Sequence, residues 1–302
     1  MVDWRGRKRS DNVIDMCGRG ASSGLGRCTA KTGGGIGILG IVILVIMFFM
    51  GADPMQLLAI ALGGDPAGSA SGYEEAPRAE PRAPAETDEH AALMGVVLED
   101  TEETWGKLFK AASSPYPEPE LVLYEESIET ACGLGSAAAG LFYCTGDKRL
   151  YLDLSFFREL GRMGALGDFA QAYVIGHEVG HHVQQVIGIL DRVQRLKSRV
   201  SQEDANGLQV LVELQADCYA VVCANHAETQ GDLLESGDAE EGLEAAAAVG
   251  DDTLQWRAGR AVNPESFTHG SSAQRIEWFQ RGMQSSDVEQ SDTFKAAGIS
   301  LR

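Results

Sequence analysis

The longest uncharged stretch of the chain, from Thr32 to Ala52, constrains the fold more than any other feature of the sequence. Its centre reads IGILGIVILVIMFFM, and a helix over the whole 21-residue stretch would be about 31 Å long, close to the thickness of a bilayer hydrocarbon core. We therefore predict a transmembrane signal anchor over residues 32–52. The alternative is a cleaved secretory signal peptide, but its apolar region would be unusually long and would begin unusually far from the N-terminus.

Charge is distributed unevenly around this stretch. Residues 1–35 contain seven Lys or Arg and three Asp, whereas the net charge of the whole chain is −19. Because Lys and Arg hold their side of an anchor in the cytoplasm, we expect a cytoplasmic N-terminus and a body on the extracytoplasmic, periplasmic side. The basic N-terminus either serves topology alone or also contacts anionic lipid. The acidic body argues against nucleic acid as a partner.

Composition divides the chain into four regions. Residues 1–31 form the basic cytoplasmic region, and residues 32–52 form the anchor. Residues 53–89 are expected to be a linker, because most of this region is rich in Pro, Ala, Gly and Glu and poor in large apolar residues. Residues 90–302 are expected to form one folded domain, since a stretch of that length can bury a sizeable core.

The body contains a short β region followed by helices. Apolar periodicity predicts three long helices, over Leu93–Ala112, Asp168–Ile187 and Glu203–Thr229. Leu121–Tyr124 is a candidate strand, and Leu141–Cys144 and Leu150–Leu154 flank a Thr-Gly-Asp-Lys turn as in a β-hairpin. The expected fold class is α+β: a mostly helical domain with a small antiparallel β-sheet, preceded by one transmembrane helix.

Cysteine positions suggest one disulfide at most in the body. Cys132 and Cys144 bracket a segment of small residues and could close a loop. Cys218 and Cys223 are five residues apart on an expected helix, which is poor geometry for a bond. The sequence contains no CxxC pair, which argues against metal binding by these cysteines.

Residues 177–182 read HEVGHH and carry the strongest chemical signal in the sequence. On a helix, His177 and His181 lie on one face and can bind the same metal ion. Glu178 then lies beside the open coordination position, where it can accept a proton from a water molecule that the metal activates. His182 faces another side of the helix and is not expected to be a ligand.

A catalytic zinc ion needs a third protein ligand, and Glu213 in VELQAD is the best candidate. Glu213 and Asp217 are four residues apart, so Glu213 can bind the metal while Asp217 accepts the N–H of a ligand histidine. The alternatives are a solvated acidic helix face, or a cysteine ligand in a closed structural site. The apolar neighbours of Glu213 favour a partly buried carboxylate pair, which calls for a cation or a hydrogen-bonding partner.

The segments HEVGHHVQQVIG, ELQADCYA and FTHGSSAQRIEWF together resemble the bacterial putative neutral zinc metallopeptidase family. The opening WRGRKRSDNVIDMCG, the anchor and CGLGSAAAGLFYCTGDKRLYLDLSFF are similar to that family too, so the resemblance covers nearly the whole chain apart from the linker. It implies a single-pass membrane protein with an exported zincin-like domain. It also implies a gluzincin-type site, in which His177, His181 and Glu213 bind one Zn²⁺ per chain and Glu178 is the base.

The segment FTHGSS contributes a further candidate, His269. Related zincins place a His/Arg element after the third ligand, and the segment resembles it. His269 would donate a hydrogen bond to the oxyanion that forms when water attacks a carbonyl, and Arg275 would orient Asp217 or Glu213. The alternative is a loop histidine that packs against the start of a helix capped by a serine. Tyr173 and Tyr219 are two further candidates for donating a hydrogen bond at the site.

These observations favour a membrane-anchored zinc peptidase that hydrolyses peptide bonds in proteins or peptides. One alternative is a non-catalytic envelope protein in which zinc serves structure alone. The other is a metal-dependent amidase that acts on cell-wall peptides with the same ligands and base. Either hydrolase would use Glu178 to accept the proton of water and pass it to the leaving amine.

Overall fold

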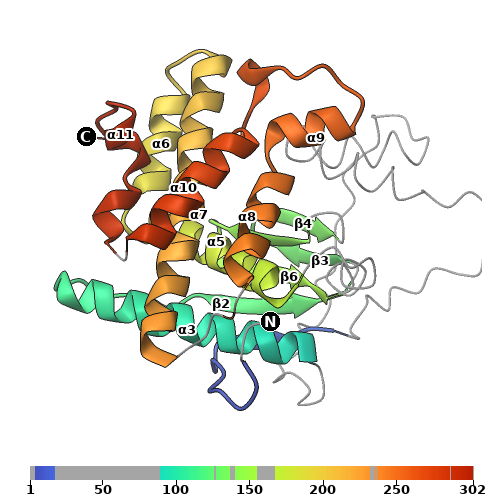
Figure 1. Cartoon of the computed structure of the whole chain (residues 1–302), viewed down its shortest axis with the longest axis vertical. Coiled ribbons are helices and arrows are strands. Elements are labelled where there is room, and N and C mark those ends of the chain that lie inside the picture. Colours follow the sequence, from blue (N-terminus) through green and yellow to red (C-terminus); the bar gives the residue numbers. More distant parts are fainter. Residues whose placement is uncertain are drawn as a thin grey trace, which may run out of the picture.

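A computed structural model of the chain describes residues 4–17, 89–125, 127–136, 140–154, 167–231, 235, 237–285 and 287–301. The transmembrane anchor predicted over residues 32–52 and almost all of the predicted linker lie outside these residues. Figure 1 shows a mostly helical body with a small sheet, which confirms the α+β class. The helices are α3 (Glu89–Ala111), α5 (Asp168–Val186), α6 (Ile189–Lys197), α7 (Gln202–Gly231), α8 (Asp238–Ala248), α9 (Asp251–Arg257), α10 (Ser272–Gln284) and α11 (Thr293–Ala296).

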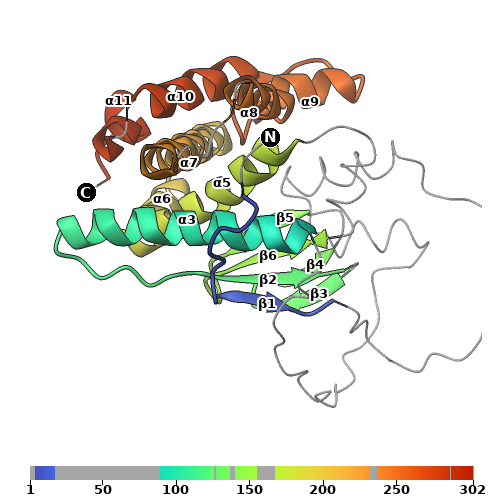
Figure 2. The same ribbon diagram turned by 60° about the horizontal axis from the view of Figure 1, so that its bottom comes forward.

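The elements are stacked in layers, as Figure 2 shows. The sheet lies at the bottom of that view, α3 and α5 lie over it, α7 lies above α5, and α8, α9 and α10 form the outermost layer. The main hydrophobic core lies between the sheet, α3, α5 and α7, where residues such as Leu98, Leu123, Leu152 and Ile175 are fully buried. Burial of such side chains is the main force that holds the layers together.

The main sheet is mixed, and the prediction of an antiparallel sheet is wrong for most of it. Its strand order is β1-β2-β6-β5, in which β1, β2 and β6 run parallel and only β5 pairs antiparallel with β6. The β5–β6 hairpin matches the predicted one, because two adjacent strands joined by a tight turn must be antiparallel. The parallel partners reach β2 through long connections, which local patterns do not specify. The strands are β1 (Val13–Asp15), β2 (Glu120–Tyr124), β5 (Leu141–Cys144) and β6 (Arg149–Asp153).

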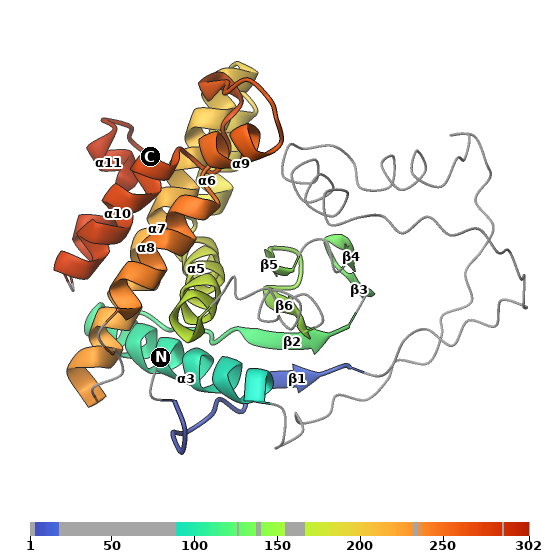
Figure 3. The ribbon, with the colours of Figure 1, turned by 45° about the vertical axis from the view of Figure 1, so that its right-hand side comes forward.

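A second, two-stranded sheet pairs β3 (Ser127–Thr130) with β4 (Gly133–Ser136) in antiparallel register. Cys132 lies in the turn between these strands and forms a disulfide with Cys144 at the end of β5. The bond therefore ties the small hairpin to the main sheet. Figure 3 shows the β3–β4 hairpin next to β5. Cys218 and Cys223 are buried free thiols, as their spacing on one helix predicts.

The first strand comes from a part of the chain that the sequence analysis assigned to a separate N-terminal region. Val13–Asp15 forms β1 and pairs with Leu121–Leu123 of β2. Residues 4–17 thus contribute a strand to the sheet of the main domain, although residues 18–88 of the sequence intervene. This assignment could not come from local patterns, because three residues are too few for a recognisable strand signal.

Helices α5 and α7 pack closely because small residues face one another. A Cβ atom at Gly176 would lie 3.1 Å from the Cα of Ala220, and one at Gly180 would lie 3.1 Å from the Cα of Ala216. Because glycine has no Cβ, the two backbones can approach to this distance. The approach brings the HEVGHH segment of α5 next to the VELQAD segment of α7.

Among the described residues, one helix is long and apolar enough to cross a membrane: Gln202–Glu228 of α7, with mean hydropathy 1.3. In its most apolar window, 78% of the residues are buried inside the protein. Burial of this kind is typical of the core helix of a soluble domain, so α7 is only weak evidence for a membrane span.

Candidate metal centre

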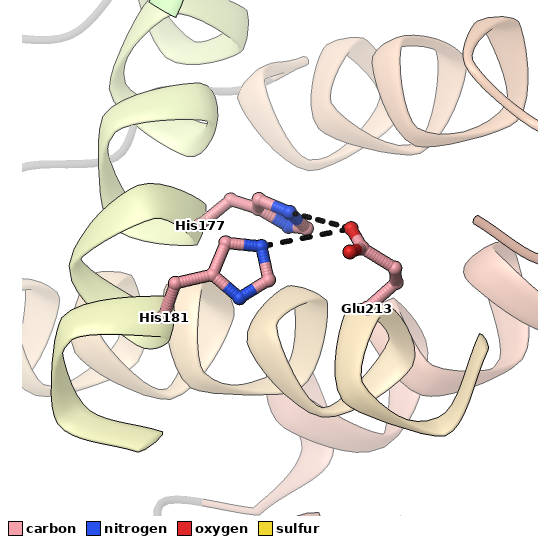
Figure 4. A group of neighbouring side chains, drawn as sticks. All are labelled: His177, His181 and Glu213. Atoms are coloured by element: carbon pink, nitrogen blue, oxygen red, sulfur yellow. Dashed lines mark hydrogen bonds and ion pairs between the residues drawn. The ribbon is translucent and has the colours of Figure 1, made fainter. Parts of the chain in front are cut away.

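Two helices bring three metal-binding side chains together. His177 and His181 project from α5 toward Glu213 on α7, as Figure 4 shows. Glu213 Oε2 lies 3.3 Å from Nε2 of His177 and 3.6 Å from Nε2 of His181. One potential ligand atom from each residue lies within 4.8 Å of the others, so a single ion can contact all three.

Neighbouring groups leave the Nε2 atoms of both histidines free to act as ligands. Nδ1 of His177 lies 2.8 Å from the Asp217 carboxylate, and Nδ1 of His181 lies 2.9 Å from Oε1 of Gln184. The amide nitrogen of Gln184 donates to the Val212 carbonyl, which identifies its Oε1 as the acceptor for His181. Both Nε2 atoms face Glu213, and each can bind a metal ion when its imidazole is neutral with the proton on Nδ1.

Glu213 is fixed in a similar way. Its Oε1 accepts a hydrogen bond of 2.8 Å from the side chain of Gln209, one turn earlier on α7, which leaves Oε2 toward the two imidazoles. Burial opposes ionisation of Glu213, but His181 and His177 outweigh it and hold the pKa of this carboxyl well below its ordinary range. The carboxylate is therefore anionic, as a metal ligand must be.

The donor set fits zinc. Burial disfavours the charged form of His177, but its hydrogen bonds to Asp217 and Glu213 outweigh burial and raise the pKa of His177 to about 10. The carboxylates of Asp217 and Glu213 thus favour a positive charge at this site. A divalent cation bound by neutral imidazoles would supply that charge. Two imidazole nitrogens and one carboxylate oxygen are a ligand set that catalytic zinc sites use, with a fourth position left for water or substrate.

Asp217 is the centre of a buried network. Its Oδ1 contacts His177 at 2.8 Å, the Tyr173 hydroxyl at 2.5 Å and the Arg275 guanidinium at 2.7 Å. Burial disfavours the Arg275 cation, but Asp217 outweighs it, and the pKa of Arg275 lies above its ordinary value. A charged carboxylate this deep needs such partners, and Arg275 and Tyr173 hold it against the ligand histidine.

The edge strand β5 holds Glu178. The backbone N–H of Tyr143 in β5 donates to Oε2 of Glu178 at 2.8 Å. Burial is the main cause that raises the pKa of Glu178 above its ordinary value. The strand holds one carboxylate oxygen, and no hydrogen bond to the other is present among the described residues, so that oxygen can take a proton.

His182, one helical turn after Glu178 on the same face of α5, contacts the same strand. Its Nε2 lies 2.7 Å from the Pro117 carbonyl and its Nδ1 lies 3.3 Å from the Tyr143 hydroxyl. Because Nε2 donates to the carbonyl, Nδ1 is the acceptor for the hydroxyl. Burial lowers the pKa of His182, so the ring stays neutral and keeps this pattern.

Replacing His182 with Ala is expected to lower the free energy of unfolding by about 1–3 kcal/mol, because it removes a buried side chain together with its hydrogen bond to the Pro117 carbonyl. Chemical denaturation of the purified protein measures this change. Gln185→Ala on the same helix is a suitable control, since the side-chain hydrogen bond of Gln185 within the described part of the chain is an exposed one to Asp191. Equal stability of the two variants would contradict a structural role for His182.

His269 lies in a loop that Asp251 shapes. One carboxylate oxygen of Asp251 accepts the backbone N–H groups of Thr268, His269 and Gly270 at 2.7, 2.7 and 3.0 Å, and the other lies 3.3 Å from Nδ1 of His269. Arg275 donates to the carbonyl of His269 at 3.3 Å, so the loop is connected to the Asp217 network. The following helix α10 begins with Ser271 as its N-cap in a capping box, as predicted.

The described residues place His177, His181, Glu213, Asp217, Tyr173 and Arg275 in one network of contacts. Glu178 follows His177 on α5, His269 joins the network through its backbone carbonyl, and Tyr219 lies elsewhere. Tyr219 packs edge-on against Trp105 at a centroid distance of 5.0 Å, inside the hydrophobic core. Sequence reasoning did not find four residues that support the site: Tyr143, Gln184, Gln209 and Asp251. Gln184 and Gln209 have helical spacing from His181 and Glu213, a signal that could have found them. Tyr143 and Asp251 reach the site only through tertiary contacts.

Comparison with known proteins agrees with this arrangement. The sequence profile described as "putative neutral zinc metallopeptidase" matches residues 2–294. The chain is 40% identical over 292 residues to an uncharacterized protein, YpfJ, of Escherichia coli K12, across 96% of this chain and 98% of that protein. It is 42% identical over 197 residues to the uncharacterized protein Rv2575 of Mycobacterium tuberculosis, across 61% of this chain and 65% of that protein. No solved structure matches the chain. The chain therefore belongs to the neutral zinc metallopeptidase family that this profile describes.

Proposed function

We propose that the protein is a zinc-dependent peptidase that hydrolyses peptide bonds in proteins or peptides. The observation that carries the proposal is the convergence of His177, His181 and Glu213, with the half-buried Glu178 next to His177 on the same helix. A purely structural zinc site has four protein ligands and no need of an adjacent base. The described residues offer three ligands and such a base, which favours hydrolysis over a structural role.

Zinc bound by these three residues would polarise the scissile carbonyl and make water acidic enough to be deprotonated at neutral pH. In the proposed reaction Glu178 accepts the proton of the attacking water on its free carboxylate oxygen, while the Tyr143 N–H holds the other. Glu178 then passes that proton to the leaving amine. Asp217 and Arg275 orient His177 throughout.

His269 is proposed to donate a hydrogen bond to the oxyanion that forms at the substrate carbonyl. His269 also contributes to the low pKa of the Glu213 carboxyl, after the larger effects of burial, His181 and His177. Asp251 would hold the ring and the backbone of His269 in position. His269 and Asp251 are thus proposed to support the substrate oxyanion and not to bind the metal.

Replacing Asp251 with Ala is expected to lower kcat/KM by about 10²-fold, since an oxyanion donor that loses its support contributes little. Zinc content should stay at the wild-type level, because the hydrogen bonds that Asp251 makes among the described residues go to the loop of residues 268–270 and not to the three proposed ligands. Asp252→Ala is the matched control, as it removes hydrogen bonds to Ser272 at the start of α10 instead. The measurements are the cleavage rate and the zinc content of both variants. Unchanged cleavage by Asp251→Ala would contradict the proposed role of His269 as oxyanion donor.

The substrate is proposed to lie along β5. This strand is the last in the order of the main sheet, and its Tyr143 contacts the proposed base directly. An edge strand offers unpaired backbone groups that an extended peptide can pair with, whatever its side chains. A peptide bound in this way would present a backbone carbonyl to the metal.

The test is cleavage of an unfolded protein such as casein by the purified full-length chain in detergent. Activity should disappear when a chelator removes zinc and return when zinc is added. Cleavage of muropeptides but not casein would favour the amidase alternative. Zinc binding without turnover of either substrate would favour the non-catalytic envelope protein.

Membrane attachment through residues 32–52 is part of the proposal and rests on the sequence alone. The disulfide between Cys132 and Cys144 supports an oxidising, extracytoplasmic location for the domain.

A further inference from the structure

The N-terminal strap, residues 4–17, is built into the catalytic domain. Its strand β1 runs parallel to β2 with Val13 opposite Leu121, and Leu121 donates its N–H to the Asn12 carbonyl at 2.9 Å. Before the strand, the N–H of Ser10 donates to the Gly95 carbonyl of α3 at 2.9 Å. Backbone hydrogen bonds therefore fix the strap to both α3 and the sheet.

Apolar side chains of the strap are part of the core. Trp4 is 7% exposed and Val13 is 8% exposed, and both pack within the main hydrophobic cluster. The strap also passes so close to α3 that a Cβ at Gly95 would lie 3.3 Å from the Cβ of Arg9. Leaving the domain would expose both apolar side chains and a strand edge to water, which opposes undocking of the strap.

The charges of the strap match those of α3. Arg7 forms an ion pair of 2.9 Å with Asp100, and Lys8 forms one with Glu99. Glu102 is buried and accepts hydrogen bonds from the side chains of Ser10 at 2.8 Å and Asn12 at 2.9 Å. Basic residues that sequence analysis assigned to topology or anionic lipid thus have acidic partners within the same domain.

The contacts of the strap with α3 and β2 limit the possible membrane topologies of the chain. If residues 18–88 crossed a bilayer once, the strap and α3 would lie on opposite sides, and β1 could not pair with β2. We infer that the N-terminal strap and the catalytic domain lie on the same side of any membrane that apolar residues 32–52 enter. The inference is independent of the proposed peptidase activity. It replaces the expectation of a cytoplasmic N-terminus joined by one crossing to a periplasmic domain.

Cysteine labelling of the full-length chain tests the inference directly. Single cysteines are placed at Asp11 in the strap and at Glu277 on α10, both exposed positions, in a chain that carries Cys17→Ser and Cys28→Ser. Membrane-impermeant maleimide is added to spheroplasts before and after lysis. Both positions should react in the same condition, whichever side that is. Reaction of one before lysis and of the other only after lysis would overturn the inference.

Limited trypsin digestion of the purified wild-type protein tests the docking itself. Cleavage at Arg7, Lys8 and Arg9 should be at least about tenfold slower than in a synthetic peptide of residues 1–17, because a protease needs the strap to open locally. Cleavage as fast as in the peptide would overturn the docking.

A matched pair of glycine substitutions on α3 links protection to the close contact. Gly95→Leu should speed trypsin cleavage of the strap and lower Tm, since the new side chain meets Arg9. Gly106→Leu should leave cleavage unchanged, because nothing lies within 4 Å of a Cβ at that position. Equal protection of the strap in both variants would also contradict the inferred docking.

Discussion

Glu178→Gln is expected to lower kcat for casein cleavage by about 10²–10⁴-fold and to leave zinc bound at the wild-type level. Gln has the shape of Glu and can still accept the N–H of Tyr143, but it cannot take a proton from water. The three ligand side chains remain in place, since Glu178 is not one of them. Initial cleavage rates and zinc content by elemental analysis measure the two quantities on the same preparation.

The control for this variant is Glu203→Gln, which makes the same chemical change at an exposed position in the first turn of α7. Cleavage by Glu203→Gln should equal that of the wild type. Near-normal cleavage by Glu178→Gln would show that another group accepts the proton. Loss of zinc from Glu178→Gln would show instead that this residue supports the metal, and the assignment of the base would have to be revised.

Glu213→Ala is expected to remove zinc almost completely and to abolish cleavage with it. The variant leaves only two imidazole ligands, and Gln209 loses its acceptor. A purified wild-type chain should hold about one zinc ion, as expected for a site with three protein ligands. The comparison requires a folded variant, which circular dichroism and a cooperative thermal transition establish.

Glu213→Gln provides a second variant in case the alanine substitution prevents folding. It keeps the volume of the side chain and an acceptor for Gln209 while removing the negative charge. Zinc retained at the wild-type level in both variants would rule out Glu213 as the third ligand. A wild-type chain that takes up no zinc even after reconstitution would leave HEVGHH without a metal, and the non-catalytic alternative would then lead.

The Glu178→Gln and Glu213→Ala variants test different steps. Glu178→Gln separates catalysis from metal binding, whereas Glu213→Ala tests metal binding itself. A chain that loses zinc only in the second variant and activity in both would match the proposed mechanism.

Local patterns predicted the elements that carry the site. The helix predicted over Asp168–Ile187 corresponds to α5, and the one over Glu203–Thr229 corresponds to α7. The hairpin of β5 and β6 and the serine cap of α10 were also predicted correctly. Each of these features depends on residues a few positions apart, so helical periodicity, turn residues and capping residues are enough to identify it.

Features that join distant parts of the chain were not predicted. The parallel pairing of β2 with β6 and the insertion of β1 beside β2 both contradict the simple antiparallel sheet. Asp251 reaches His269 across 18 residues, and Tyr143 reaches Glu178 across 35. The local sequence around Asp251 is that of an ordinary acidic residue at the start of a helix. The local sequence around Tyr143 is that of an ordinary aromatic residue in a strand.

By itself, the sequence determined that His177, His181 and Glu178 lie on one helix and that Glu213 and Asp217 lie on another, because the spacing of residues along a helix fixes the faces they share. Only the tertiary structure decided that the two helices meet at Gly176 and Gly180, and that the N-terminal strap completes the sheet. The physical reason is that helix periodicity is a local property of the backbone, whereas close packing and strand pairing depend on which distant surfaces bury one another.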